Sequence, residues 1–202
     1  MDIELLQCLL LEAFHAGQPV VLLATPGDAS LARARQLAQR LSAWLAGLLT
    51  PACGGLSRSA TPGLAAVAVC REGAVGVDAQ ARAGVSAQAL AGPFAHPDEL
   101  RALSLAPPAD TARLALWARK EAVLKAWGVG LGIAPAEVRA GLRDEAWCGV
   151  RHPVLGAAHL CSLAVREPDH SVAVALAGQA ASRATPALAI FTAGADGRWR
   201  RA

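Results

Sequence analysis

The chain has 202 residues, of which 54% are hydrophobic and 17% are charged, and its formal net charge is +3. This composition is typical of a folded globular protein with one sizeable core or two small lobes, and it excludes a disordered chain. The sequence contains no run of about eighteen strongly apolar residues, so we expect no membrane span. The net charge is small, and no basic patch is interleaved with aromatic residues. Both observations argue against nucleic-acid binding.

Two further features predict a cytoplasmic protein. The first residues include Asp2 and Glu4, where a secretory signal would carry basic residues. The five cysteines are widely spaced and form no C-x-x-C pair, so neither a zinc site nor a disulfide framework is expected. We expect the protein to be a monomer.

The first fifty residues predict two helices with a strand between them. Apolar residues recur at helical spacing over residues 2–15, and a short apolar strand follows at 19–24. A second helix is predicted over about 29–49, beginning at Asp28 or Ser30, because both residue types cap helix N-termini.

The next thirty residues predict a loop followed by a β-hairpin. Residues 51–63 are rich in Gly, Pro, Ser and Thr, which favours a loop. Apolar residues 64–70 and 74–80 flank Arg71-Glu72-Gly73, and this pattern predicts two strands joined by a tight turn.

The second half contains the clearest helix of the chain. It is predicted to begin at Asp110 or Thr111 and to end at Gly128, because glycine readily adopts the left-handed conformation that stops a helix. A shorter helix is predicted around residues 97–103.

Strands at 160–166 and 171–176 give the second half the same order as the first, a helix and then a hairpin. This order hints at a duplicated α+β unit. We therefore expect an α+β fold with two lobes, at about 1–83 and 84–178, and an extended C-terminal tail over 179–202.

Two segments contain charged residues that are candidates for a functional site. Residues 117–131 read W-x-R-K-E-A-x-x-K-A-x-G-x-G-L and place Glu121 one helical turn before Lys125. Alone, such a pair is usually a solvated ion pair that contributes roughly 0.2–0.5 kcal/mol. Upstream, a short apolar strand ends in Asp78, which alone could be a turn cap. Two carboxylates from different elements beside an ammonium also suit Mg²⁺ bound to phosphates.

Together these segments resemble the two signature motifs of 4'-phosphopantetheinyl transferases of the Sfp type, and the likeness extends over about residues 55–132. The resemblance implies two similar α+β lobes in a pseudo-twofold arrangement. It also implies a reaction: the phosphopantetheine arm of coenzyme A is transferred to a serine of an acyl or peptidyl carrier protein, leaving adenosine 3',5'-bisphosphate. Such transfer serves fatty acid, polyketide or nonribosomal peptide biosynthesis.

The resemblance assigns roles to individual residues. Asp78 and Glu121 would hold Mg²⁺, and Glu121 would also take the proton of the carrier serine. Lys125 would lie beside the phosphates as a positive charge. Gln80 stands where many members have a second acid. It would at most be a neutral metal ligand or hold a bound water.

A third segment, Gly55-Leu56-Ser57-Arg58-Ser59, resembles the family's S-H-S segment, which contacts coenzyme A, with arginine in place of the usual histidine. The alternative is a polar loop before a strand. The coenzyme A contacts that we expect are Ser57, Arg58, Lys120 and Lys125, together with Arg33, Arg35 and Arg40 of the preceding basic helix.

The expected partners are coenzyme A and a carrier protein, whose acidic recognition helix suits the mildly basic balance of this chain. Leu90, Phe94 and Leu100 are candidate carrier contacts or ordinary core residues. A second hypothesis is a degenerate protein that binds coenzyme A or a carrier without transferase activity. The intact Asp78 and Glu121 argue against that hypothesis.

Overall fold

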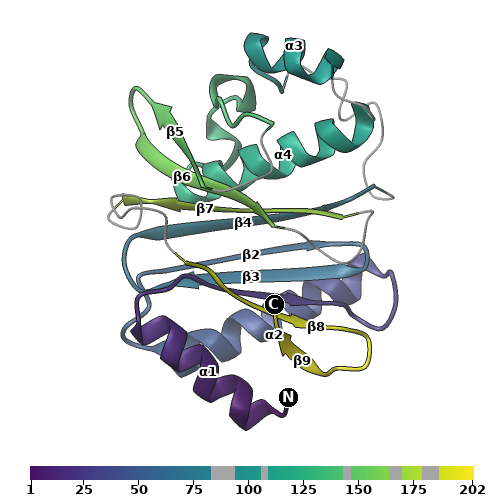
Figure 1. Cartoon of the computed structure of the whole chain (residues 1–202), viewed down its shortest axis with the longest axis vertical. Coiled ribbons are helices and arrows are strands. Elements are labelled where there is room, and N and C mark those ends of the chain that lie inside the picture. Colours follow the sequence, from purple (N-terminus) through teal and green to yellow (C-terminus); the bar gives the residue numbers. More distant parts are fainter. Residues whose placement is uncertain (83–93, 106–108, 143–146, 164–169, 179–186) are drawn as a thin grey trace.

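The structure is a computed structural model in which residues 1–82, 94–105, 109–142, 147–163, 170–178 and 187–202 are described. Its elements form four layers, with two β-sheets stacked in the middle and helices on both outer faces (Figure 1). The predicted α+β class is therefore confirmed.

The first sheet contains elements from both ends of the chain and has the strand order β2-β3-β1-β8-β9. Two helices cover its outer face, α1 (Ile3–His15) and α2 (Leu31–Leu49). Ser30, and not Asp28, caps α2, because its hydroxyl accepts a hydrogen bond from a backbone amide of the first turn. The strands are β1 (Val20–Ala24), β2 (Gly55–Thr61), β3 (Leu64–Cys70), β8 (Ala189–Ala193) and β9 (Trp199–Arg201).

The second sheet is antiparallel and has the strand order β4-β7-β6-β5. Helix α4 (Ala109–Ala126) packs on its outer face, and α3 (Pro97–Leu105) packs against α4. Gly128 adopts a left-handed conformation just after α4, as predicted. Two short 3₁₀ turns follow, η2 (Gly130–Gly132) and η3 (Pro135–Glu137). The strands are β4 (Ala74–Ala81), β5 (Cys148–His152), β6 (Gly156–Leu163) and β7 (His170–Ala177).

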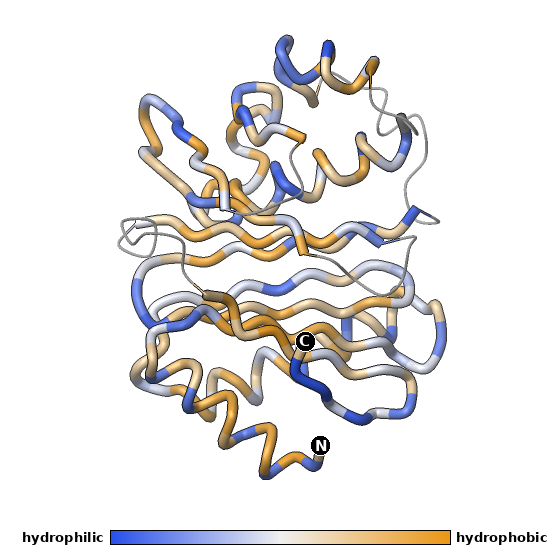
Figure 2. The backbone as a smooth tube through the Cα atoms, viewed as in Figure 1, coloured by the Kyte–Doolittle hydropathy of each residue, from blue (hydrophilic) through white to orange (hydrophobic). Residues whose placement is uncertain are grey.

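Apolar side chains pack between the four layers. Figure 2 shows hydrophobic residues along the strands in the middle of the molecule. On β7, alternate residues belong to two different cores. Its valines and Leu176 pack between the two sheets, whereas its alanines pack under α4. Because side chains alternate along a strand, β7 places large residues against the other sheet and small ones against the helix.

The same alternation divides β4. Val75, Val77 and Ala79 lie in the core between the sheets. The intervening residues Gly76, Asp78 and Gln80 therefore share the face that α4 covers. This division places a carboxylate of β4 beneath the helix that carries Glu121 and Lys125.

The predicted hairpin of residues 64–70 and 74–80 is wrong, although both segments are strands. β3 pairs with β1 and β2, and β4 pairs with β7. The turn between them instead carries the chain from one sheet to the other. Two apolar strands joined by a short turn have the same local sequence pattern in either arrangement.

Two segments predicted without regular structure are strands. Within the predicted loop 51–63, residues 55–61 form β2, an edge strand whose burial is only partial. The expected tail over 179–202 supplies β8 and β9, and β8 pairs in parallel with β1. The first sheet therefore includes both ends of the chain, and β4 lies in the second sheet. The expected lobe boundaries at 83 and 178 do not match the sheets.

Candidate active site

Asp78 is the centre of a group of polar side chains contributed by three elements. Its side chain is only 4% exposed, and its Oδ1 accepts hydrogen bonds from Lys125 Nζ of α4 at 2.6 Å and from Ser59 Oγ of β2 at 2.9 Å. Its Oδ2 accepts from Gln80 Nε2 at 2.7 Å. The ammonium and the two neutral donors thus satisfy both oxygens of this buried carboxylate.

Gly76 allows α4 to come close enough for this contact. A Cβ atom at this position would lie 1.9 Å from the backbone oxygen of Ala122 and 2.6 Å from the backbone nitrogen of Ala126. Only glycine fits there without moving the helix. The close approach of α4 to β4 therefore brings Lys125 within reach of Asp78.

The ion pair that the structure shows for Lys125 is with Asp78, and Lys125 Nζ also donates to the backbone oxygen of Val77 at 3.0 Å. Glu121, one turn earlier on α4, lies in the same electrostatic environment. Burial raises the pKa of its carboxyl, the negative charge of Asp78 raises it further, and Lys125 lowers it. The helix pair is therefore part of a partly buried charge cluster with Asp78 and not an isolated surface ion pair.

The residues of this cluster fit a divalent cation. The negative charge of Asp78 raises the pKa of Glu121, because the two carboxylates repel each other. A hard cation that binds oxygen ligands would relieve this repulsion. Among the described residues, no set of three or more His, Cys, Asp and Glu side chains is grouped to hold a metal. Asp78 and Glu121 would thus supply two ligands, as expected for Mg²⁺ that completes its shell with phosphates and water.

A pocket of about 310 Å³ lies between α2 and β2, and Ser59 is one of the residues that line it. Two of the predicted coenzyme A contacts, Arg35 and Arg58, line it together. Arg58 also donates to Ser42 Oγ of α2 at 3.4 Å. Two guanidinium groups in one concave pocket suit a phosphate group. The remaining lining residues are Ala38, Gln39, Ser59 and Ala60.

Three other predicted contacts lie outside this pocket. Arg33 is exposed and pairs with Asp28 at 3.1 Å, and Arg40 is exposed on α2. Ser57 is partly buried, and its hydroxyl accepts a hydrogen bond from Val77 N at 3.0 Å. The structure therefore brings Arg35 and Arg58 together and leaves Arg33, Arg40 and Ser57 with other neighbours.

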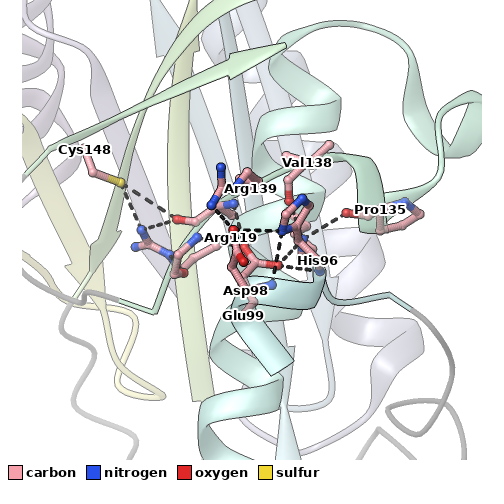
Figure 3. Close-up of polar contacts among 11 residues, drawn as sticks. His96, Asp98, Glu99, Arg119, Pro135, Val138, Arg139 and Cys148 are labelled. Atoms are coloured by element: carbon pink, nitrogen blue, oxygen red, sulfur yellow. Dashed lines mark hydrogen bonds and ion pairs between the residues drawn. The ribbon is translucent and has the colours of Figure 1, made fainter. Parts of the chain in front are cut away.

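Lys120, a predicted coenzyme A contact, is instead buried inside the protein and does not line the pocket. Its side chain is 0% exposed, and its ammonium pairs with Glu99 at 2.6 Å. It also donates to the backbone oxygens of Pro135, at 2.9 Å, and Val138. Burial lowers the pKa of Lys120, and Glu99 opposes this shift. All three ammonium hydrogens are used inside the protein, where Glu99, Pro135 and Val138 converge (Figure 3).

Arg119, the preceding residue, is also fully buried, and its guanidinium binds the same segment after α4. It donates to the backbone oxygens of Ala140 and Gly141 and to Ser162 Oγ, each at 2.8 Å. It also donates to Cys148 Sγ at 3.0 Å (Figure 3). Residues 119 and 120 of the motif therefore anchor α4 to the chain that follows it, while residues 121 and 125 face β4.

The three residues proposed as carrier contacts or core residues are Leu90, Phe94 and Leu100. Trp117 packs edge-on against Phe94, with 5.5 Å between ring centroids, and Phe94 is a core residue. Leu100 is 50% exposed on α3. Leu90 lies outside the described residues.

The sequence placed Ser59 in the segment that resembles the family's S-H-S segment but did not predict its contact with Asp78. The signal was present in the alternation of Ser57, Ser59 and Thr61, which places three hydroxyls on one face of a strand. Reading residues 51–63 as a loop concealed this alternation.

Comparison with known proteins agrees with this geometry. The family model for the 4'-phosphopantetheinyl transferase superfamily matches residues 74–175, just over half of the chain. The match includes Asp78, Glu121 and Lys125, whereas Arg35 and Arg58 lie outside it. A search of curated proteins found no match. Within the described part of the chain, no helix is long and apolar enough to cross a membrane. On the family match, the chain belongs to the 4'-phosphopantetheinyl transferase superfamily.

Proposed function

We propose that the protein transfers 4'-phosphopantetheine from coenzyme A to a serine hydroxyl of an acyl or peptidyl carrier protein, as a holo-carrier-protein synthase of the Sfp type that requires Mg²⁺. The observation that carries the proposal is the charge cluster of buried Asp78 with the partly buried Glu121 and Lys125, formed where α4 lies on β4. Membership of the superfamily supports the transfer chemistry in general.

Asp78 and Glu121 are the residues that would hold Mg²⁺, with Gln80 as a neutral neighbour. When bound, the cation would neutralise negative charge on the pyrophosphate oxygens of coenzyme A. Lys125 contributes a second positive charge at the same place. We propose that Arg35 and Arg58 bind a phosphate of coenzyme A in the pocket between α2 and β2.

Glu121 is the proposed general base. Its raised pKa makes its carboxylate a stronger proton acceptor than an exposed glutamate. The carrier serine would attack the phosphorus that bears the pantetheine arm as Glu121 takes its proton. The new bond joins the serine oxygen to this phosphorus. The bond that breaks is the one from this phosphorus to the bridging oxygen, which leaves with adenosine 3',5'-bisphosphate.

The test is to incubate the protein with coenzyme A, MgCl₂ and a panel of apo-acyl and apo-peptidyl carrier proteins, and to weigh each carrier by mass spectrometry. We expect at least one carrier to gain one phosphopantetheine group, and we expect a chelator to prevent the gain. Calorimetric binding of coenzyme A to the protein is measured in parallel. Binding without any transfer would favour the degenerate binding protein instead.

A further inference from the structure

Strands β2 and β4 belong to different sheets, yet side-chain hydroxyls join them along their length. Ser57, Ser59 and Thr61 of β2 accept hydrogen bonds from the backbone amides of residues 77, 79 and 81, at 3.0, 3.2 and 2.9 Å. Each is two residues from the next, so all three lie on the same side of β2. They satisfy amides of an edge strand that would otherwise lack partners. We call this set the hydroxyl ladder.

Ser59 is the middle hydroxyl of the ladder, and it makes a second hydrogen bond. Its oxygen accepts from Ala79 N, and its hydrogen is donated to Asp78 Oδ1 at 2.9 Å. A hydroxyl can do both at once because it has one donor and two acceptor positions. Thr61 has the same backbone contact, to Ala81 N, and serves as a natural comparison.

The three donors to Asp78 differ in how firmly they are held. Lys125 and Gln80 reach the carboxylate with long side chains, which have many rotamers. Ser59 has a single side-chain torsion before its hydroxyl, and its oxygen is already bonded to the β4 backbone one residue from Asp78. The serine is therefore the donor whose position fixes the direction of the carboxylate.

We propose that Ser59 is a positioning residue that holds the Asp78 carboxylate in the orientation needed for catalysis; this inference rests on the proposed function. Ser59 also lines the pocket that contains Arg35 and Arg58. The proposed phosphate pocket and the proposed metal ligand therefore share one rigid side chain of β2.

The kinetic test compares Ser59→Ala with Ser59→Thr and with Thr61→Val in the full chain. Ser59→Ala should lower kcat at least about tenfold, with KM for coenzyme A changed by no more than about threefold, because orientation and not binding is lost. Ser59→Thr retains the hydroxyl and should restore most of kcat. Thr61→Val deletes one ladder contact of the same kind and should leave both constants unchanged. Equal kcat values for Ser59→Ala and Thr61→Val would overturn the proposal.

A second readout does not require activity. The NMR signal of the Asp78 carboxyl carbon, assigned with Asp78→Asn, is recorded in the same variants without coenzyme A or metal. It should shift in Ser59→Ala and keep its wild-type position in Ser59→Thr and Thr61→Val. A signal that is unchanged in Ser59→Ala, or that moves equally in Thr61→Val, would overturn the positioning role. If the wild-type protein transfers nothing to any carrier, the proposed function fails, and the NMR comparison still decides the role of Ser59.

Discussion

Glu121 has an unfavourable charge in the folded protein, and this cost is useful only if the residue acts chemically. Its carboxylate is partly buried and faces the negative charge of Asp78, and Lys125 compensates only in part. A residue retained for stability alone would avoid such a position, because burial and a like charge both disfavour ionisation. Perturbed carboxylates of this kind are concentrated at functional sites.

We predict that Glu121→Gln strongly slows transfer without unfolding the protein. The amide can neither accept the serine proton nor supply a negative ligand charge, so the rate should fall by roughly 10²–10³-fold or more, as for loss of one preorganised group. Stability should be unchanged or slightly higher, because an unfavourable buried charge is removed. The rate is measured by mass spectrometry of the carrier and the stability by urea unfolding.

Glu137→Gln is the matched control for this prediction. Glu137 is an exposed glutamate of η3, so its amide variant should have wild-type activity. Comparable rates for the two variants would mean that Glu121 takes no part in the reaction.

Gln80 provides a second test of the site. Its amide donates to Asp78 Oδ2, so replacing it with glutamate places a second carboxylate against Asp78. We predict that Gln80→Glu strengthens Mg²⁺ binding in the absence of coenzyme A, because a divalent cation relieves the added repulsion. Coenzyme A should tighten Mg²⁺ binding in the wild-type protein, since phosphate oxygens complete the shell.

Calorimetric titration of MgCl₂ into both proteins, with and without coenzyme A, measures these differences. If the coenzyme-free proteins have the same Mg²⁺ affinity, position 80 does not contribute to the metal site.

Among the elements, the packing of α4 on β4 decides whether the site forms. Two contacts set the position of the helix. Gly76 sets its distance from the strand, and the buried cations of Arg119 and Lys120 fix its rotation by binding the segment that follows it. Neighbouring residues of a helix differ by about 100° in direction, so anchoring residues 119 and 120 determines where residue 121 faces.

We predict that Gly76→Ala destabilises the protein and reduces transfer more than its stability loss explains. The new methyl group would overlap the backbone of α4 at Ala122 and Ala126. Because these are backbone atoms, the helix or the strand would have to move to relieve the overlap. Overpacking of this kind costs about 1–3 kcal/mol or more. The displaced helix would move Lys125 away from Asp78. Urea unfolding and transfer rates are measured at a temperature where the variant is folded.

Gly149→Ala is the control. This glycine also lies in a strand, β5, but a Cβ there would meet no atom within 4 Å. It should leave stability and rate close to wild type. A folded Gly76→Ala protein with full activity would show that the helix can move without disturbing the site.

In the whole molecule, the C-terminal strands β8 and β9 complete the first sheet, which also contains β2 and its residue Ser59. β8 pairs with β1, and Phe191 is fully buried beneath α1 and α2. The chain end is therefore part of the first core, with β9 at the sheet edge.

We predict that truncation after Leu188, which removes β8 and β9, strongly destabilises or aggregates the protein. It exposes the edge of β1 and empties the space of Phe191, a loss of roughly 3–5 kcal/mol for the side chain alone. Truncation after Gly197 removes only β9 and should cost much less. Size-exclusion chromatography and urea unfolding compare the two with the full chain. Equal stability of all three would mean that β8 contributes nothing to the core.

The sequence was sufficient for features that depend on neighbouring residues. Helices α1, α2 and α4 were predictable because apolar spacing, capping residues and Gly128 act within a few residues of each other. The resemblance of two short motifs also selected Asp78, Glu121 and Lys125, which the fold then brings to one place.

Only the tertiary structure decided which strands pair and which side chains face the site. The alternating hydroxyls of β2 are uninformative until β4 lies beside them, and β8 is a strand because it adds to β1 across about 170 residues of chain. Lys120 and Glu121 are adjacent and both charged, yet one is an internal anchor and the other faces Asp78. The physical reason is that strand pairing and burial depend on contacts between residues distant in sequence, which local propensity does not encode.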